Sequence, residues 1–198
     1  MIIGLTGGVA SGKSESAKYF EELGACCIDA DAISKELTAK GEPLLKELID
    51  IFSADILLPD GILNRKKLAD IIFSDSNAKL KVEQIIHPRI IARINKIISN
   101  KISEKRLIVI NAPLLFEAGL YRNCDKIIVV KAPYDIQVQR LSLRDGLNDD
   151  EIKKRISSQM SVEEKVKLAD FVVDNSGSKK ALKKKIENIY GLLTSNFK

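Results

Sequence analysis

One short loop near the start of the chain constrains the fold more than any other segment. Residues 7–14 read GGVASGKS and match the pattern Gly-x-x-x-x-Gly-Lys-Ser/Thr at every fixed position. The apolar run Ile2–Leu5 precedes this loop, and a helical pattern begins near Ser14. A strand that enters such a loop and a helix that leaves it form a phosphate-binding unit. The sequence therefore predicts that the chain binds a nucleoside triphosphate.

The residue types in this loop match the chemistry of a bound triphosphate. Gly7 and Gly12 permit backbone angles that other residues avoid, so that successive N–H groups can surround an anion. Lys13 is expected to reach the β- and γ-phosphates, and the Ser14 hydroxyl is expected to ligate Mg²⁺. The predicted ATP-binding residues of this segment are Gly8, Val9, Ala10, Ser11, Gly12, Lys13, Ser14 and Glu15.

Five apolar runs of strand length alternate with helical patterns along the chain. They are Ile2–Leu5, Ala25–Ile28, Leu107–Ile110, Ile127–Val130 and Phe171–Val173. None alternates polar with apolar residues, which is typical of strands covered on both faces of a parallel sheet. Helices are expected at 14–23, 44–52, 65–73, 77–100, 136–144, 149–158, 162–168 and 178–193, with the fourth ended or kinked at Pro88. These patterns predict an α/β fold with a five-stranded, parallel, doubly wound sheet.

The spacing of the second and third strands indicates an insertion. About 78 residues separate Asp29 from Leu107, whereas an ordinary crossover needs roughly a dozen or more. The extra chain has helical patterns and follows the carboxyl end of a strand, where doubly wound sheets bind ligands. We expect one domain, with a core at about 1–31 and 104–198, a helical substrate-binding insertion at about 32–103 and a helical lid at about 136–160.

Composition excludes several classes of protein. A single histidine rules out a multi-histidine metal site, and three cysteines without a Cys-x-x-Cys spacing indicate free thiols in a reducing compartment. Without a signal-peptide pattern or an apolar run of about 18 residues, we expect a cytoplasmic protein. The net charge of +5 suits polyanionic ligands. Only 5% of the residues are aromatic, and a protein that binds single-stranded nucleic acid usually stacks bases on aromatic rings.

Other segments favour a small kinase over other nucleotide-binding proteins. The Asn-Lys-x-Asp string of a GTPase is missing, and the third strand ends in Asn111 instead of the carboxylate of a motor or regulatory ATPase. Asp31 follows the second strand at the ligand-binding edge, where it is expected to orient an attacking hydroxyl. The alternative is that Asp31 caps the next helix, and the two roles are compatible.

Two arginines predict a flap that closes over the phosphates. Arg140 and Arg144 are four residues apart on one face of a helix, which precedes a turn near Gly146. Guanidinium groups suit bidentate phosphate contacts, and a small kinase needs a lid that excludes water. His87, directly before Pro88, is expected to have a structural or substrate-lining role.

The assembled strings resemble one family, dephospho-CoA kinase, over nearly the full chain. They are LTGG at 5–8, IDAD at 28–31, IHP at 86–88, PLLFE at 113–117, QR at 139–140, Gln159 and ADFVVDNSG at 169–177. The loop is generic, whereas the Asp-Ala-Asp, His-Pro and Pro-Leu-Leu-Phe-Glu strings in this order are specific. The resemblance implies transfer of the γ-phosphoryl group of ATP to the ribose 3′-hydroxyl of dephospho-CoA. It also implies a P-loop kinase core with an inserted helical substrate domain and a lid.

The resemblance also implies roles for single residues. Asp31 would orient the hydroxyl, Arg140 would bind the phosphates from the lid, and Asn175 would lie near the adenine of ATP. The implied catalytic residues are Lys13, Asp31 and Arg140. Arg144 and Asn175 join the ATP-binding set, and the implied substrate-binding residues are Asp31, Lys35, His87, Pro113, Leu115 and Arg140.

Three positions depart from the family pattern. Glu15 stands where a threonine is frequent and adds negative charge beside the phosphates. Lys35 stands where an arginine is common, and a lysine lacks the planar guanidinium group that can donate two parallel hydrogen bonds. Asn111 replaces a frequent aspartate. The expected partners are ATP with Mg²⁺ and dephospho-CoA, without nucleic acid or membrane, for a monomer or weak homo-oligomer. The alternatives are a P-loop kinase for another nucleotide or small alcohol and a non-enzymatic ATP-binding regulator.

Overall fold

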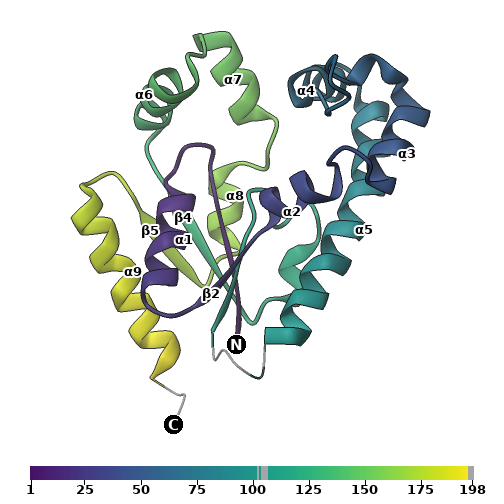
Figure 1. Ribbon diagram of the computed structural model, residues 1–198. Helices are drawn as coiled ribbons and strands as arrows, with labels where there is room; N and C mark the ends of the chain where they lie inside the picture. The colour runs from purple at the N-terminus through teal and green to yellow at the C-terminus, as the bar shows by residue number, and fades with distance from the viewer. Residues whose placement is uncertain (102, 104–106, 196–198) are drawn as a thin grey trace. The chain divides into compact units, whose positions relative to one another are not determined.

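The chain forms two compact units in a computed structural model that describes residues 1–101, 103 and 107–195 (Figure 1). The sheet unit comprises Met1–Asp29 and Ile98–Lys198, and the helical unit comprises Ala30–Ile97. The predicted insertion at about 32–103 overlaps most of the helical unit. Its predicted end lies beside residues 102 and 104–106, which are outside the described residues, so that boundary stays a prediction.

The sheet unit is built on five parallel strands in the order β2-β3-β1-β4-β5. They are β1 (Ile2–Gly7), β2 (Cys26–Asp29), β3 (Ile108–Asn111), β4 (Lys126–Lys131) and β5 (Phe171–Asp174). All four residues of β3 and the four inner residues of β4 are buried, as expected for strands covered on both faces. The predicted fold class is confirmed, with strand ends displaced by one or two residues.

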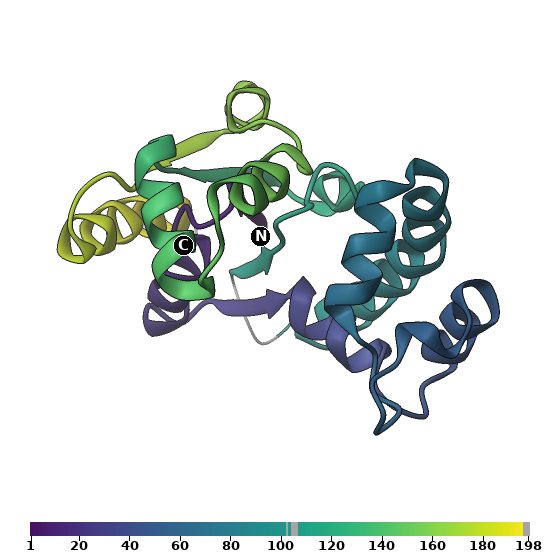
Figure 2. The same ribbon diagram turned by 90° about the horizontal axis from the view of Figure 1, so that it is seen from above.

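One face of this sheet is covered by α1 (Lys13–Glu22) and α9 (Lys179–Thr194), which contact each other (Figures 1 and 2). Apolar side chains of both helices pack against Ile3 and Leu5 of β1 and against Ile128 and Val130 of β4. Gly4 faces the other side because side chains alternate along a strand, and there it meets Leu115 and Cys124. The short helix α8 (Val162–Lys167) contacts β4.

Two helices follow β4 where the lid is predicted. Helix α6 (Tyr134–Asp145) ends at Gly146, whose φ of 64° is a left-handed conformation that favours glycine. Helix α7 (Asp149–Ser157) begins with a capping box between Asn148 and Glu151. A 3₁₀ turn, η2 (Leu120–Asn123), precedes β4. The lid function of α6 and α7 stays a prediction.

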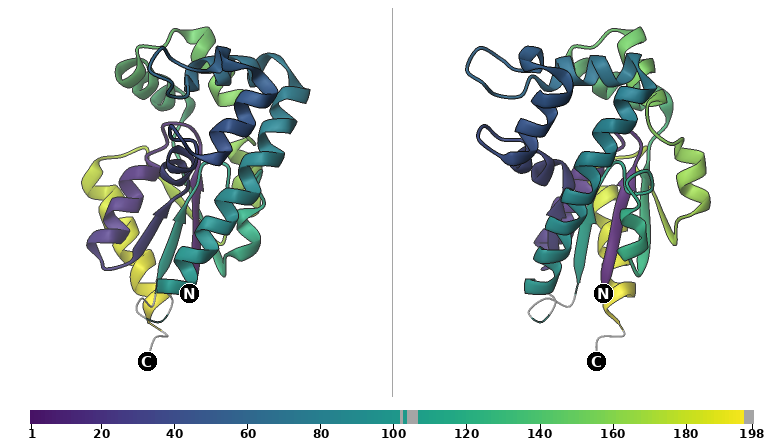
Figure 3. Two further views of the ribbon diagram at one scale, coloured as in Figure 1. Left: turned by 45° about the vertical axis from the view of Figure 1, so that its right-hand side comes forward. Right: turned by 90° about the vertical axis from the view of Figure 1, so that its right-hand side faces the viewer.

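The helical unit contains α2 (Ala30–Leu37), α3 (Pro43–Phe52), η1 (Ala54–Ile56), α4 (Arg65–Ser74) and most of α5 (Ser76–Lys101), as Figure 3 shows. Its core is a cluster of buried aliphatic side chains from α3, η1, the segment before α4, α4 and α5: Leu45, Leu48, Ile56, Leu63, Leu68 and Val82. The predicted helix ranges omit α2, although the capping alternative for Asp31 implies a helix at this place, and this eight-residue helix follows β2 without a turn.

Helix α5 continues through Pro88, so of the two predicted outcomes, an end or a kink, the end is wrong. A proline removes the N–H bond to the residue four positions earlier and crowds that turn. For Pro88 the carbonyl that loses its helical donor is that of Gln84, and Arg89 Nη1 donates to the next carbonyl of this turn, that of Ile85, at 2.9 Å. Its Nη2 donates to Glu47 of α3, which fastens the proline turn to the neighbouring helix.

The three cysteines are free thiols. Burial raises the pKa of Cys27 and Cys124 to about 12, which keeps both thiols protonated at neutral pH. Among the described residues, no helix is both long enough and apolar enough to span a membrane.

Candidate active site

The glycine-rich loop connects the buried strand β1 to helix α1 at the carboxyl edge of the sheet. Its backbone turns tightly, with the Ser11 N–H donating to the Gly8 carbonyl at 3.2 Å. Gly12 has φ of 96°, and Ala10 has φ of 56° although it carries a side chain. Non-glycine residues in this region store strain that the surrounding structure must balance, and such residues cluster at functional sites.

Two glycines of the loop are required by close contacts. A Cβ atom on Gly7 would lie 2.2 Å from the Val130 carbonyl oxygen, a backbone atom of the adjacent strand. A Cβ atom on Gly12 would lie 2.1 Å from Asn175 Nδ2, in addition to the left-handed backbone. The pattern therefore has a steric basis at both fixed glycines.

Lys13 is bound to the end of the neighbouring strand β3. Its ammonium group donates to Oδ1 of Asn111, which is 3% exposed. The Nδ2 group of Asn111 in turn donates to Asp29 Oδ2 at 3.1 Å. The amide of Asn111 thus connects the loop lysine to the carboxyl end of β2, a contact that the sequence did not predict.

Arg140 and Asn175 hold the other end of the loop. Arg140 donates from Nη1 to the Ala10 carbonyl and from Nη2 to the Asn175 carbonyl, both at 3.1 Å. The buried Asn175 side chain donates to the Ser11 carbonyl at 2.7 Å. These residues come from α6 and from the segment after β5, so both segments contact this loop. Their predicted contacts with phosphate and adenine remain predictions.

Arg144 does not share this position, although it is four residues after Arg140. It forms two hydrogen bonds with Asp145, at 2.7 and 2.9 Å, and Arg155 donates to the same carboxylate at 2.8 Å. These hydrogen bonds, with that of Arg144 the strongest, hold the pKa of Asp145 below its ordinary value. In the free protein, the predicted pair of phosphate-binding arginines is therefore divided between the loop and Asp145.

The first turn of α1 carries Ser14 and Glu15. Ser14 is exposed at the helix start, as expected for a hydroxyl that would ligate Mg²⁺. The Glu15 carboxylate accepts a hydrogen bond from Tyr19 at 3.1 Å and lies 3.6 Å from the Lys179 ammonium. These two contacts partly offset the negative charge that the sequence places beside the phosphates.

The turn after β3 is held by a buried lysine that sequence reasoning missed. Lys165 of α8 is fully buried, donates to the Pro113 carbonyl at 2.7 Å and lies 3.2 Å from Glu117. Burial lowers the pKa of Lys165, while the Glu117 carboxylate acts in the opposite direction. Leu115 is fully buried against Gly4, so its side chain belongs to the core and only the turn itself is available to a ligand.

Three predicted substrate residues, Asp31, Lys35 and His87, lie in the helical unit. Asp31 is in the first turn of α2, which begins at Ala30, so Asp31 is not the capping residue. Lys35 is one turn later and is exposed, whereas His87 is half-buried in α5. The structure adds Arg65, whose pKa is lowered by burial and raised by the charge of Asp31, and which donates to Thr38 Oγ1 at 2.6 Å.

The donor set around the loop fits a metal ion that arrives with a nucleotide. In the described parts of the chain, no group of three or more His, Cys, Asp or Glu side chains is placed to hold a metal. A single exposed Ser14 hydroxyl suits Mg²⁺, which keeps several waters and binds mainly through substrate phosphates. The parallel sheet, the phosphate loop and its lysine define the class of the protein, a P-loop kinase.

Comparisons with known proteins identify the family. Residues 1–181 match the family described as Dephospho-CoA kinase (CoaE). A dephospho-CoA kinase from Aquifex aeolicus is 43% identical over 192 residues, which cover 97% of each chain. The solved dephospho-CoA kinase from Campylobacter jejuni has a TM-score of 0.71 and 31% identity, and a solved Thermus thermophilus protein has 0.80 and 32%, with 98% of each chain covered. The chain belongs to the dephospho-CoA kinase family of ATP-using phosphotransferases, which carry out the final step of coenzyme A biosynthesis.

Proposed function

We propose that this chain transfers the γ-phosphoryl group of ATP to the ribose 3′-hydroxyl of dephospho-CoA, forming coenzyme A and ADP. The observation that carries the proposal is the phosphate loop of a family member, with Lys13 held by Asn111 at the carboxyl edge of the sheet. In the transfer, a bond forms between the 3′-oxygen and the γ-phosphorus while the bond from that phosphorus to the β–γ bridging oxygen breaks. The hydroxyl proton leaves through a nearby base.

The ATP end of the reaction is assigned to the sheet unit. Backbone N–H groups of residues 8–12 would surround the phosphates, and Lys13 would stabilise negative charge on the β- and γ-oxygens. Ser14 would hold Mg²⁺, which supplies neutralising charge to the phosphate oxygens. Arg140 would exchange a carbonyl partner for a phosphate oxygen, since guanidinium groups bind anions more strongly than neutral acceptors. Asn175 would bind ATP from its place beside the loop, and Arg144 would bind the phosphates when the lid closes.

The acceptor end is assigned first to Asp31. Asp31 would accept a hydrogen bond from the 3′-hydroxyl and orient it, since a loose transition state requires little deprotonation. Lys35, His87 and the Pro113–Leu115 turn would border the acceptor. The charge of Arg65 interacts with that of Asp31, which places a cation near the proposed base.

Location and assembly complete the proposal. The free thiols and the family support a cytoplasmic enzyme. We also propose that the enzyme is a monomer or weak homo-oligomer that uses no nucleic acid.

An ADP-release assay with ATP and Mg²⁺ tests the function. Dephospho-CoA, adenosine, AMP, CMP and shikimate are supplied separately, and turnover is expected with dephospho-CoA. Lys13→Ala is the matched control and should abolish turnover, because it removes the charge on the transferring group. Signal with only the other four acceptors would reject the proposed substrate, and an active Lys13→Ala variant would reject the loop mechanism.

A further inference from the structure

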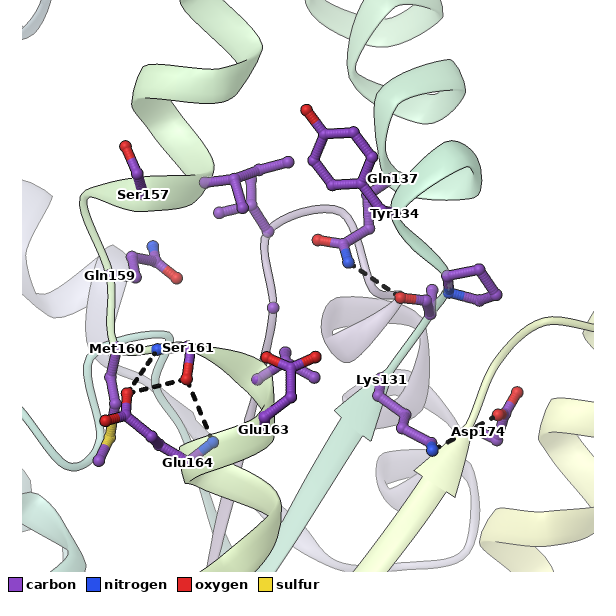
Figure 4. Close-up of a pocket in the computed structure, with 16 residues that line it drawn as sticks. Lys131, Tyr134, Gln137, Ser157, Gln159, Met160, Ser161, Glu163, Glu164 and Asp174 are labelled. Carbon is purple, nitrogen blue, oxygen red and sulfur yellow. Dashed lines mark hydrogen bonds and ion pairs between the residues drawn. The ribbon is translucent and has the colours of Figure 1, made fainter.

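A cavity of about 620 Å³ adjoins the first residues of the phosphate loop, within the sheet unit (Figure 4). Gly8 and Val9 form one side, the segment from the end of β4 into α6 forms a second, and the segment between α7 and α8 forms a third. Its volume is within the range of small-molecule sites, about 300–1,000 Å³. It adjoins the Gly8 end of the loop, whereas Arg140 and Asn175 bind carbonyls at the Ala10–Ser11 end.

Two glutamine side chains point into this cavity from opposite walls (Figure 4). Gln137 of α6 is 6% exposed, and its Nε2 donates to the Ala132 carbonyl at 2.9 Å, so its Oε1 is the atom left to accept. That oxygen has no hydrogen-bond donor, and neither has Oε1 of Gln159, before α8. Buried acceptors without a donor are uncommon in folded proteins and require an explanation. A ligand that brings N–H donors supplies one.

The charges at the cavity exclude a phosphate group. Glu163, Glu164 and Asp174 line it, and its lysine, Lys131, lies 3.9 Å from Asp174. A phosphate would be repelled by these carboxylates, whereas a neutral group with donors would not. The remaining lining is largely apolar and includes Val9, Pro133, Tyr134, Ile156, Met160 and Val162.

We propose that this cavity binds the adenine ring of the acceptor, dephospho-CoA, with the exocyclic amino group donating to Gln137 and Gln159. This inference rests on the proposed function. The ring is flat and neutral, which suits the apolar walls, and its amino group carries two N–H donors for two facing acceptors. The acceptor's diphosphate is excluded by the carboxylates, and each amide of its pantetheine arm offers only one N–H donor. The cavity is at the Gly8 end of the loop, away from the contacts of Asn175, where the base of ATP is predicted.

The test compares two acceptors and two variants. The acceptors are dephospho-CoA and its deaminated counterpart, in which hypoxanthine replaces adenine and an oxygen acceptor replaces the amino group. The unaltered enzyme should prefer dephospho-CoA by about 30-fold or more in kcat/KM, because a site built for a donor rejects an analogue without it. Gln159→Met keeps the side-chain length but removes the acceptor. It should raise the KM for dephospho-CoA about tenfold and reduce the preference to about threefold, with the KM for ATP unchanged.

Gln139→Met is the matched control, since Gln139 is exposed on α6 and does not line this cavity. It should behave as the unaltered enzyme. Thermal unfolding of each variant shows whether it is folded, and Gln159→Glu, which keeps an acceptor oxygen, should retain part of the preference.

Three results would overturn the inference. One is that the unaltered enzyme and Gln159→Met both use dephospho-CoA and prefer it to the deaminated acceptor by the same factor. Another is a raised KM for ATP together with a weakened preference for ATP over ITP, which would assign the cavity to the nucleotide donor. If the unaltered chain does not phosphorylate dephospho-CoA at all, the proposed function fails as well, and this outcome is distinguishable from the first two.

Discussion

Replacing Asn175 with alanine tests whether a buried amide holds the phosphate loop. The substitution removes the 2.7 Å hydrogen bond from Nδ2 to the Ser11 carbonyl. The bond from Arg140 to the backbone oxygen of residue 175 can persist, so the loss is confined to one side chain. Leaving a buried acceptor without its partner costs about 1–3 kcal/mol. For a chain of 198 residues, this lowers Tm by about 2–12 °C.

The same energy should appear in nucleotide binding, because ATP requires the loop in one conformation. If the full cost falls on that conformation, the Kd for ATP rises about 5-fold to 150-fold. Calorimetric titration with ATP gives the Kd, and thermal unfolding gives Tm. Asn188→Ala is the control, since Asn188 is exposed on α9 and should leave ATP binding unchanged.

A titration with GTP separates this role from contact with the adenine. If Asn175 acts by holding the loop, ATP and GTP binding weaken by the same factor, whereas a base contact would affect ATP alone. Unchanged Tm and unchanged ATP affinity in Asn175→Ala would refute the reasoning that the amide supports the loop.

Other contacts give three further predictions. Lys165→Met should lower the free energy of unfolding by about 3–5 kcal/mol in urea titrations, because Glu117 is left without its buried partner. The double variant with Glu117→Leu should recover part of this loss, and an additive double variant would contradict the pairing. Asp31→Asn should lower kcat far more than ATP affinity in steady-state kinetics, and a change in Tm alone would indicate a structural role. The hydrogen bond from Lys126 is the first cause that lowers the pKa of Asp170 from 3.8. The ionised Asp170 carboxylate therefore stabilises the folded state above pH 3.8, and this contribution is lost as pH falls through the folded pKa. In Asp170→Asn, the free energy of unfolding should depend less on pH in that range. The same acid dependence in both proteins would contradict this assignment.

The sheet could be predicted because the patterns that indicate its strands lie within short stretches of sequence. Each strand is a short apolar run, and the loop pattern specifies both its neighbours in sequence and its position at the carboxyl edge. The ends of helices were harder to predict from the sequence. The sequence predicts that the helix ends or is kinked at Pro88, and α5 continues through this residue to Lys101. Arg89 beside this proline also donates to Glu47 of α3, which is 42 residues earlier, and no window of local sequence reports such a contact.

The sequence motifs named candidate site residues, but they did not predict which other residues these side chains contact. The pattern specified Lys13, but Asn111 is 98 residues away and is joined to it only by the alignment of β1 with β3. Lys165 gave no signal, because a lysine in a polar helix is usually exposed and this one is buried against the turn at Pro113. Arg140 and Arg144 share a helical spacing, yet their partners differ because Asp145 follows Arg144 directly.

The contacts around the loop share a chemical property that bears on phosphate binding. Lys13 is held by the amide of Asn111, Ser11 by the amide of Asn175, and Ala10 by a guanidinium group on its carbonyl. Each of these contacts positions the loop through a neutral group or a cation, so none adds a carboxylate at that position. An aspartate in place of Asn111 would add a negative charge beside the site expected for the phosphates, which the neutral amide does not. The Asn111 amide holds Lys13 in place before a nucleotide binds, and groups placed in advance cost no reorganisation when charge develops.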